Sequence, residues 1–575
     1  MNFGSKDGEM RKAVSSAKVY FAYAALFSFF INVLMLVPAI YMLQVYDRVV
    51  SSGSVETLIM LTLIAVLLFS SMGGLEWVRS RILVRASVYI DQLLGQKVFD
   101  AAFKQSLYSG GRASIQPLND LNGIRQFLTG NSLFAFFDAP WVPVYLFVMY
   151  LFHPLFGLMG LIAAIYLFIL TIANEKSTHK LLENASKEAN AGTASAASNL
   201  RNAEVIESMG MLATFRERWQ WRQNEVLALQ AKASDRAGIF ASLSKVSRMA
   251  LQSLALGLGA YLAINLEISP GMMIAGSIML GRALAPIDQM IGAWKGLVSA
   301  RSQFNRLDEL LGKMPDDTEP MPLPEPQGNF SAENLMVAPP GTRQAVLSGV
   351  NITINKGEVI GIVGPSGAGK STFARALLGI WPAMSGKIRL DGADIFQWDR
   401  EALGQHIGYL PQDIELFDGT ISENIARFYN VDPEKVVAAA QAVGVHELIL
   451  ALPKGYDTVI GVSGGALSGG QRQRIGLARA MYDNPAVLVL DEPNSNLDDE
   501  GEKALFATLQ KIKSTRSATV VIISHKPGIL AVTDKVLVLK DGQVAAFDTT
   551  QNIMAAAQPK KAAPQVTSAS SVVTI

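Results

Sequence analysis

Long apolar segments in the first half of the sequence constrain this chain more than any other feature. Lipid offers the backbone no hydrogen-bond partners, so segments of about twenty apolar residues that cross a bilayer must be helical. One such segment could be a buried helix of a soluble core, but a series of them is typical of a membrane domain. The predicted spans cover residues 20–43, 57–78, 132–152, 154–174, 249–267 and 270–292.

The composition agrees with a membrane half followed by a soluble half. Only 17% of the residues are charged, against about 25% in a typical soluble domain, and the deficit lies in residues 20–314. The net charge of +1 favours no nucleic-acid partner. The chain has no cysteine, which excludes disulfides and cysteine zinc sites, and its five histidines lack metal-ligand spacing.

Lysine and arginine predict the orientation of the spans. They concentrate in the N-terminal tail, residues 1–19, and in the long loops after the second and fourth spans, whereas the alternate loops are short and hold only Arg48. Positive charge favours the cytoplasmic side, so both termini should be cytoplasmic. The first span lacks a small-residue cleavage pattern and is interpreted as an anchor. The long loops are patterned as helices and should extend the spans into the cytoplasm.

Three ionisable residues, Asp138, Arg282 and Asp288, fall within the predicted spans. At 1.5 Å per residue, Arg282 lies about 18 Å from Pro270, close to mid-bilayer. Such groups should face the bundle interior or a cavity. Two interpretations remain open, a polar translocation path and interhelical ion pairs. Pro286 should kink the last helix between Arg282 and Asp288.

A linker rich in proline and acidic residues, Pro315–Gly328, marks the domain boundary. Residues 329–557 alternate short β-branched runs with helical patterns, which predicts an α/β domain with a parallel sheet covered by helices. The last segment, residues 558–575, is small, polar and proline-bearing and should be a disordered tail.

A phosphate-binding loop follows a short apolar strand in the soluble half. Gly364–Ser371 fits the pattern G-x-x-x-x-G-K-S between a strand and a helix. In this motif backbone N–H groups surround the phosphates, Lys370 contacts the β- and γ-phosphates, and the Ser371 hydroxyl ligates Mg²⁺. The predicted ATP-binding residues here are Gly364, Pro365, Ser366, Gly367, Ala368, Gly369, Lys370, Ser371 and Thr372.

Two further apolar strands predict the rest of a hydrolytic site. Val487–Asp498 places Asp491 and Glu492 at the end of a strand, where open α/β sheets bind ligands. Asp491 is expected to hold Mg²⁺, and Glu492 is expected to act as general base toward the attacking water. Thr519–His525 places His525 at the same edge, with a predicted role at the γ-phosphate.

The stretch LSGGQRQRIGLARA, Leu467–Ala480, is patterned as an anion-binding helix N-terminus that has no lysine. A cradle without a lysine is explained if another chain provides that lysine. The chain should therefore work as a homodimer, in which this stretch of one copy faces the γ-phosphate bound by the loop Gly364–Ser371 of the other. The predicted contacts are Ser468, Gly469, Gly470 and Gln471. The arginines that follow should pack on the domain's own surface.

Together these elements resemble the ATPase domain of ABC transporters, with LSGGQ as the signature. Pro411–Asp413 resembles the Q-loop, which implies that Gln412 contacts ATP and Mg²⁺. Ser495–Asp498 resembles the D-loop, which implies that Asp498 communicates between the two subunits. Six spans followed by one ATPase domain resemble a half-exporter of the type IV ABC exporter fold, in which inside loops, here Tyr108–Gln116 and Asn202–Leu212, contact the ATPase domains.

A closer resemblance is to the alkaline-protease and lipase secretion ATPases of type I secretion systems, carried by Tyr41–Leu58, Leu133–Tyr145, Gly281–Gln289, Pro339–Leu347 and Arg389–Asp399. The resemblance implies a location in the inner membrane of Gram-negative bacteria. It also implies a periplasmic membrane-fusion protein, an outer-membrane channel of TolC type and a secreted, unfolded protein substrate, often an RTX repeat protein, with a C-terminal signal.

The sequence departs from the exporter pattern at two positions. Pro339 stands where many exporters stack a tyrosine on adenine, and Val462 stands where many have a glutamate. About twenty residues precede the first span, so we expect no N-terminal peptidase domain. The alternatives are a lipid, peptide or drug exporter with the same ATPase, and a non-transport ABC ATPase of DNA repair or translation, which the spans argue against.

Overall fold

The computed structural model describes residues 8–108, 114–130, 132–313, 323–461 and 467–557. The predicted tail 558–575, most of the linker and Val462 lie outside these residues. Contacts divide the chain into two compact units, residues 1–106 with 112–315, and residues 107–111 with 316–575.

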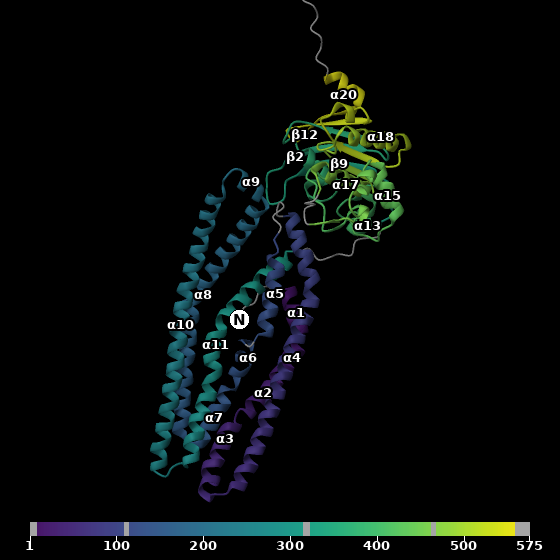
Figure 1. Ribbon diagram of the computed structural model, residues 1–575. Coiled ribbons are helices and arrows are strands. Elements are labelled where there is room, and N and C mark those ends of the chain that lie inside the picture. Colours follow the sequence, from purple (N-terminus) through teal and green to yellow (C-terminus); the bar gives the residue numbers. More distant parts are fainter. Residues whose placement is uncertain (1–7, 109–113, 131, 314–322, 462–466, 558–575) are drawn as a thin grey trace, which may run out of the picture. The chain divides into compact units, whose positions relative to one another are not determined.

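The first unit is helical (Figure 1). Its long helices run alongside one another and are joined by short turns. The elements are α1 Glu9–Ser16, α2 Lys18–Leu34, α3 Val37–Gln44, a π-helical stretch Val45–Val50, α4 Val55–Tyr108, α5 Gln116–Thr129, α6 Ser132–Asp138, a 3₁₀ turn Ala139–Trp141, α7 Val142–Phe152, α8 Pro154–Arg201, α9 Ala203–Ser208, α10 Leu212–Ile264 and α11 Pro270–Gly312.

Within the described residues, five helical runs are long and apolar enough to cross a membrane, namely residues 18–50, 55–108, 132–152, 154–201 and 270–312. They contain five of the six predicted spans. Large apolar side chains on α4, such as Ile59, Leu63 and Leu67, are more than half exposed, as expected of a helix that faces lipid.

The sixth predicted span, 249–267, differs from the structure. It lies at the end of α10, which stops at Ile264, three residues before the predicted end, and α10 is not among these five runs. Its packing still places it beside the other spans. A methyl group on Gly259 would lie 2.8 Å from Met273 of α11 and 3.0 Å from Phe156 of α8.

The prediction that the inside loops extend the spans as helices is confirmed. α4, α8 and α10 are 54, 48 and 53 residues long, well beyond the roughly 20 residues that a bilayer needs. The short helix α9 occupies the predicted contact segment Asn202–Leu212 between α8 and α10. Much of the other predicted contact segment, Tyr108–Gln116, lies outside the residues that the structure describes.

Part of the segment 1–19, which was predicted to be an N-terminal tail, is a packed helix. Residues 9–16 form α1, whose Met10 and Ala13 are buried against Leu94 of α4 and Leu307 of α11. Glu9 adds ion pairs to Lys97 at 2.6 Å and to Lys12 at 2.7 Å. These two lysines lower the pKa of Glu9 to about 2. α1 therefore docks on the extensions of α4 and α11.

The second unit is an α/β domain with two main sheets. A parallel sheet has the strand order β12-β11-β3-β10-β9-β6, in which only β12 is antiparallel. An antiparallel sheet of order β2-β1-β4-β5 was not predicted. The strands are β1 Phe330–Val337, β2 Leu347–Ile354, β3 Val359–Val363, β4 Ala383–Leu390, β5 Ala393–Asp394, β6 Ile407–Leu410, β7 Gly419–Thr420, β8 Val459–Ile460, β9 Val487–Asp491, β10 Thr519–Ile523, β11 Lys535–Lys540 and β12 Gln543–Thr549.

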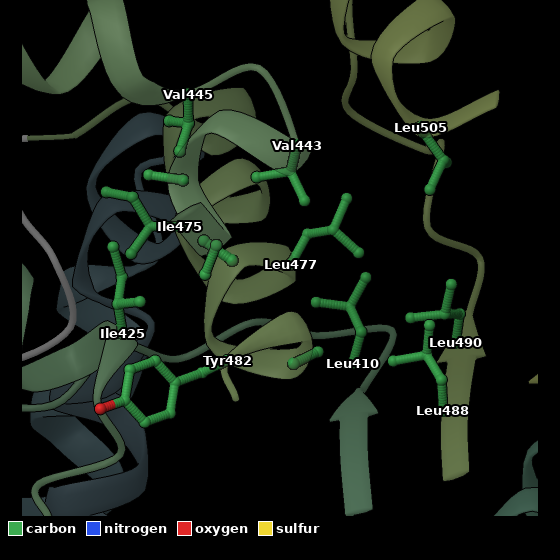
Figure 2. Packing of buried hydrophobic residues seen from close by; sticks show 14 of the residues in the cluster. Leu410, Ile425, Val443, Val445, Ile475, Leu477, Tyr482, Leu488, Leu490 and Leu505 are labelled. Atoms are coloured by element: carbon green, nitrogen blue, oxygen red, sulfur yellow. The ribbon is translucent and has the colours of Figure 1, made fainter. Parts of the chain in front are cut away.

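Helices cover the parallel sheet, and their apolar side chains form a hydrophobic core with those of the strands. On one side Ile475 and Leu477 of α17 pack near Leu410, Leu488 and Leu490 of the sheet (Figure 2). The helices are α12 Lys370–Leu377, α13 Arg400–His406, α14 Ile421–Ile425, α15 Pro433–Ala442, α16 His446–Leu450, a 3₁₀ turn Gly455–Asp457, α17 Gly469–Met481, α18 Asp499–Thr515, α19 Pro527–Leu530 and α20 Thr550–Ala557.

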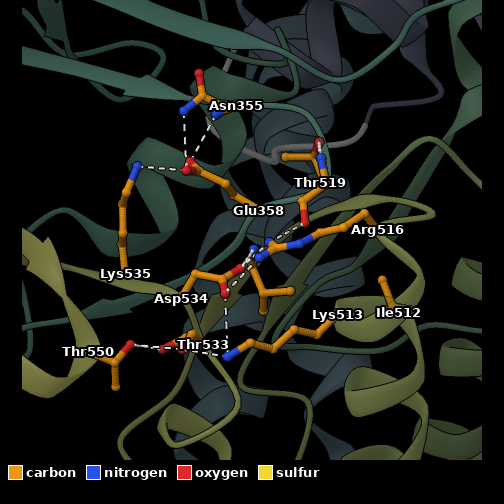
Figure 3. A network of polar contacts seen from close by, with 12 residues as sticks. Asn355, Glu358, Ile512, Lys513, Arg516, Thr519, Thr533, Asp534, Lys535 and Thr550 are labelled. Atoms are coloured by element: carbon orange, nitrogen blue, oxygen red, sulfur yellow. Dashed lines mark hydrogen bonds and ion pairs between the residues drawn. The ribbon is translucent and has the colours of Figure 1, made fainter.

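Polar contacts fix the amino-terminal edge of the parallel sheet (Figure 3). Asp534 accepts hydrogen bonds from the Val359 amide at 2.9 Å and from Arg516 at 2.6 Å. Asp391 holds the end of the linker by accepting from the amides of Gln327 at 2.6 Å and Asn329 at 3.0 Å. These contacts tie the starts of the strands to one another, and open α/β sheets bind ligands at the opposite, carboxyl edge.

Candidate nucleotide-binding site

The phosphate-binding loop lies between β3 and α12, as predicted. Gly369 has φ 95°, and a methyl group there would lie 2.6 Å from Leu347. A methyl group on Gly364 would lie 2.2 Å from the Leu539 carbonyl oxygen. Lys370 is buried, and its ammonium donates to the carbonyls of Gly364 at 2.8 Å and Pro365 at 3.0 Å. The lysine therefore folds over its own loop.

The two acidic residues at the end of β9, Asp491 as its last residue and Glu492 directly after it, differ in their surroundings. Asp491 is 3% exposed, and burial raises the pKa of its carboxyl, although a hydrogen bond from Ser371 opposes the rise. Glu492 has φ 50°, its amide donates to the Ile523 carbonyl at 3.0 Å, and it lies 3.5 Å from the Gln412 amide nitrogen. The strained backbone turns Glu492 away from the strand direction.

These oxygen donors fit a magnesium ion that ATP helps to hold. Mg²⁺ prefers oxygen ligands and is often bound by one or two carboxylates together with substrate phosphates. Ser371 and Asp491 are joined by a hydrogen bond, and Gln412 lies next to Glu492. The structure shows no protein-only cluster of three acidic or histidine ligands among the described residues.

The strand order brings the predicted hydrolytic residues to one edge. β10 lies between β3 and β9, and β6 lies beyond β9. Lys370, Asp491 and Gln412 thus follow the carboxyl ends of three parallel strands. His525 comes two residues after the end of β10 and is exposed, so its predicted place at this edge is confirmed. Its neighbour Ser524 is buried and donates to Asn494 at 3.1 Å.

The signature segment begins α17, and its side chains cap that helix. Ser468 accepts from the Gln471 amide at 3.2 Å, while the Gln471 side chain accepts from the Ser468 amide at 2.9 Å. This reciprocal capping satisfies two of the free N–H groups of the helix. Gln471 thus has a capping role that the sequence analysis missed. Within the described residues no hydrogen bond joins Ser468–Gln471 to the phosphate loop.

Gln473 is a functional candidate that the sequence analysis missed. It is 1% exposed, its amide nitrogen donates to the carbonyls of Pro493 at 2.7 Å and Glu492 at 3.2 Å, and its amide oxygen accepts from the Asn496 amide at 2.9 Å. A methyl group on Gly470 would lie 2.7 Å from the Asn496 carbonyl oxygen. The signature helix is therefore tied to the loop that follows Asp491.

Asp498 and the signature arginines make contacts within the domain. Asp498 caps α18 by accepting from the Gly501 amide at 2.9 Å, and it pairs with Arg474 of α17. Arg479 donates to the Glu415 carbonyl at 3.2 Å. For these two arginines the prediction that they pack on the domain's own surface is confirmed.

The predicted adenine region remains without an assigned contact. Pro339 lies in a turn, and its carbonyl accepts from the amide of Thr342 at 3.1 Å and from the hydroxyl of Thr342 at 2.9 Å. Proline offers no aromatic face for adenine, so another residue has to cover the base.

Two of the three ionisable residues in the predicted spans, Asp138 and Asp288, lie in contact with an arginine of another helix. Asp138 is buried and accepts from Arg79 at 2.8 Å and from Asn32 at 3.0 Å. Asp288 accepts from Ser244 at 2.7 Å and lies 3.5 Å from Arg248. These contacts favour the interhelical ion pairs over a translocation path for both aspartates.

Arg282 is exposed and makes no hydrogen bond or ion pair within the part of the chain that the structure describes. It remains the candidate for a path. α11 continues through Pro286 as one helix.

Family models match both halves of the chain. The ABC transporter model matches residues 347–495, and the ABC transporter transmembrane region matches residues 21–283. The type I secretion system ATP-binding protein PrsD of Rhizobium meliloti (strain 1021) is 43% identical over 551 residues, which cover 96% of this chain and 94% of that protein.

The chain belongs to the ABC transporter family. It is a multi-pass membrane protein that couples ATP hydrolysis to transport. The leukotoxin export ATP-binding protein LtxB of Aggregatibacter actinomycetemcomitans is 30% identical over 92% of this chain and 76% of its own length. The leukotoxin translocation ATP-binding protein LktB of Mannheimia glucosida is 29% identical over the same shares.

A solved structure of a bacterial Atm1-family ABC exporter with ATP bound has the same fold. Its TM-score is 0.80, at 23% identity, over 94% of this chain and 96% of that one. The predicted architecture of a helical exporter domain followed by an ABC ATPase domain is therefore confirmed.

Proposed function

We propose that this ABC transporter is the ATP-hydrolysing membrane component of a type I secretion system and exports an unfolded protein. The observation that carries the proposal is the 43% identity to PrsD, which extends over 96% of the chain and so includes both domains. The leukotoxin exporters LtxB and LktB, similar over 92% of the chain, support the same class of substrate.

The proposed location is the inner membrane of a Gram-negative bacterium. Both termini are cytoplasmic, since Lys and Arg concentrate in the N-terminal segment and in the long loops that continue as α4, α8 and α10. The proposed partners are a periplasmic membrane-fusion protein, an outer-membrane channel of TolC type and a secreted protein with a C-terminal signal.

The proposed working unit is a homodimer with two shared ATP sites. In each site, backbone N–H groups of the loop Gly364–Thr372 (all but Pro365, which has none) bind the phosphates. Lys370 moves from its own loop carbonyls onto the β- and γ-phosphates. Ser468, Gly469, Gly470 and Gln471 of the other copy close the site from the opposite side. The free amides at the start of α17, together with the helix dipole, favour an anion there. Among the described residues, Ser468–Gln471 make no hydrogen bond to the phosphate loop of their own chain, which supports this sharing.

Hydrolysis depends on the carboxyl edge of the parallel sheet. Mg²⁺, when bound by Ser371, Gln412 and Asp491, supplies neutralisation of phosphate charge. Glu492 accepts the proton of the attacking water, and His525 hydrogen-bonds the γ-phosphate. Asp498, at the start of α18, passes the state of one site to the other subunit. The helix α9 and the segment Tyr108–Gln116 transmit closure to the spans.

The experiment uses the full chain in inside-out membrane vesicles. A fluorescent, unfolded polypeptide encoded beside the transporter gene is added outside the vesicles with ATP. We expect it to become protected from protease with the wild type and not with Glu492→Gln, which should instead copurify with the polypeptide. Fluorescent lipid and dye are tested in parallel. ATP-dependent movement of lipid or dye, with no protection of any polypeptide, would replace this proposal by the alternative of a lipid or drug exporter.

A further inference from the structure

A cavity of about 470 Å³, with charged and neutral polar side chains among its lining residues, lies between α8, α10 and α11 of the helical unit. Ligand-binding pockets have volumes of about 300–1,000 Å³, so this one can hold more than an ion. Its lining residues lie beyond the predicted spans, at positions 179–189 of α8, Gln230 of α10 and positions 295–305 of α11. The ATP site and the polar residues of the spans are elsewhere.

Two cations in the cavity wall lack counter-ions. Lys295 and Arg301 of α11 are exposed, and neither makes a hydrogen bond or ion pair with any residue that the structure describes. A third cation on the same helix, Arg306, is fully paired, because it donates to both carboxylate oxygens of Asp120 at 2.8 and 2.6 Å. The charges of Lys295 and Arg301 are thus free to bind an anion, whereas the charge of Arg306 is neutralised by Asp120.

The one carboxylate among the lining residues does not neutralise these cations. Glu183 forms an ion pair with Lys187 at 2.8 Å and lies 3.9 Å from the His179 ring. The Lys187 ammonium lowers the pKa of Glu183, so Glu183 stays ionised and engaged on α8. Neutral hydrogen-bonding groups, such as Gln230 and Asn305, complete the wall. The wall therefore has a net attraction for carboxylates.

We propose that this cavity binds an acidic, extended stretch of the exported polypeptide before it is transported. The inference rests on the proposed function, because it names the part of that substrate which the helical unit recognises. Lys295 and Arg301 are six positions apart, about 9 Å along the helix axis. In the polyproline II conformation, which is common in unfolded chains, three residues make one turn of about 9 Å, so carboxylates three residues apart lie on the same face about 9 Å apart. A compact anion such as phosphate reaches both cations only if the two side chains bend toward each other.

The probe is a short Gly/Ser peptide with two aspartates three residues apart, and its control carries asparagines instead. Binding to the full-length transporter in lipid nanodiscs is measured by fluorescence anisotropy, together with peptide stimulation of ATP hydrolysis. The variant Lys295→Gln/Arg301→Gln should bind the aspartate peptide about tenfold more weakly, at about threefold for each charge contact. The asparagine peptide should bind weakly to every form.

A matched control removes a charge directly after α11, outside the cavity. Lys313→Gln loses a lysine that pairs with Glu309 at 2.7 Å, and it should bind the aspartate peptide as the wild type does. Equal binding by the wild type and the double variant would overturn the proposal. Inorganic phosphate that binds through Lys295 and Arg301 while the aspartate peptide does not would also overturn it. Export of polypeptide by the double variant at the wild-type rate would remove the cavity from the pathway and leave the proposed function standing. Failure of the wild type to export any polypeptide would instead remove the proposed function.

Discussion

Replacing Gln473 by leucine should slow ATP hydrolysis and leave ATP binding nearly unchanged. The Gln473 side chain is 1% exposed and bridges the Pro493 carbonyl, at 2.7 Å, and the Asn496 amide, at 2.9 Å. Leucine has a similar volume but bonds neither group. Two buried hydrogen bonds at about 1 kcal/mol each give a loss of about 2 kcal/mol.

The assay is steady-state ATP hydrolysis by the purified transporter, with binding of a fluorescent ATP analogue measured separately. If these hydrogen bonds hold Glu492 in place in the transition state, losing them raises the activation free energy by about 2 kcal/mol. The kcat should then decrease about 30-fold, since about 1.4 kcal/mol changes the rate tenfold. Gln441→Leu, an exposed glutamine of α15, is the matched control and should keep its activity. A wild-type kcat for Gln473→Leu, with an unchanged melting temperature, would refute the coupling.

Three further predictions follow from other contacts. Glu492→Gln should bind ATP but hydrolyse it about 10²–10⁴-fold more slowly, whereas Glu500→Gln, an exposed neighbour on α18, should not; equal ATPase rates for the two variants would remove the general base. Arg79→Met leaves Asp138 buried without its ion pair and should destabilise the protein by about 3–5 kcal/mol; thermal unfolding should show recovery in Arg79→Met/Asp138→Leu, and an unchanged single variant would contradict the pair. Burial raises the pKa of Asp391, but hydrogen bonds from Asn329, Gln327 and Gly328 outweigh it and the net pKa is lowered. The contribution of Asp391 to stability is thus present at neutral pH and lost as the pH falls through the acidic range below the usual carboxyl pKa. Acid unfolding should be less steep in Asp391→Asn, and an unchanged curve would contradict that contribution.

Patterns that repeat along the chain predicted much of the fold. Apolar length located five of the six spans within long helices, because a bilayer requires unbroken helix. The phosphate loop and the acidic strand end were predicted since glycine, lysine and carboxylate occur there at fixed spacing around a strand. Boundaries were less certain, as the end of α10 at Ile264 shows.

Contacts between distant segments could not be predicted. Asp138 pairs with Arg79, which is 59 positions away, and only packing of α4 beside α6 brings them together. Gln473 of α17 likewise donates to the Pro493 carbonyl, 20 positions away, only because the fold brings α17 beside the loop after β9. The docking of α1 did have a signal, since Met10, Ala13 and Ala17 are spaced as one face of a helix. The antiparallel sheet had none, because a short β-branched run does not identify its partner.

The shared ATP site is tested most directly by mixing two inactive chains. Ser468→Arg has an intact phosphate loop and a damaged signature segment, whereas Lys370→Ala has the reverse. A homodimer of either variant therefore lacks a complete site and should not hydrolyse ATP. Coexpressed with different tags and purified through both, the mixed dimer holds one complete site and should recover ATP hydrolysis. A mixed dimer as inactive as its parents, or a Ser468→Arg homodimer as active as the wild type, would contradict a site built by two chains.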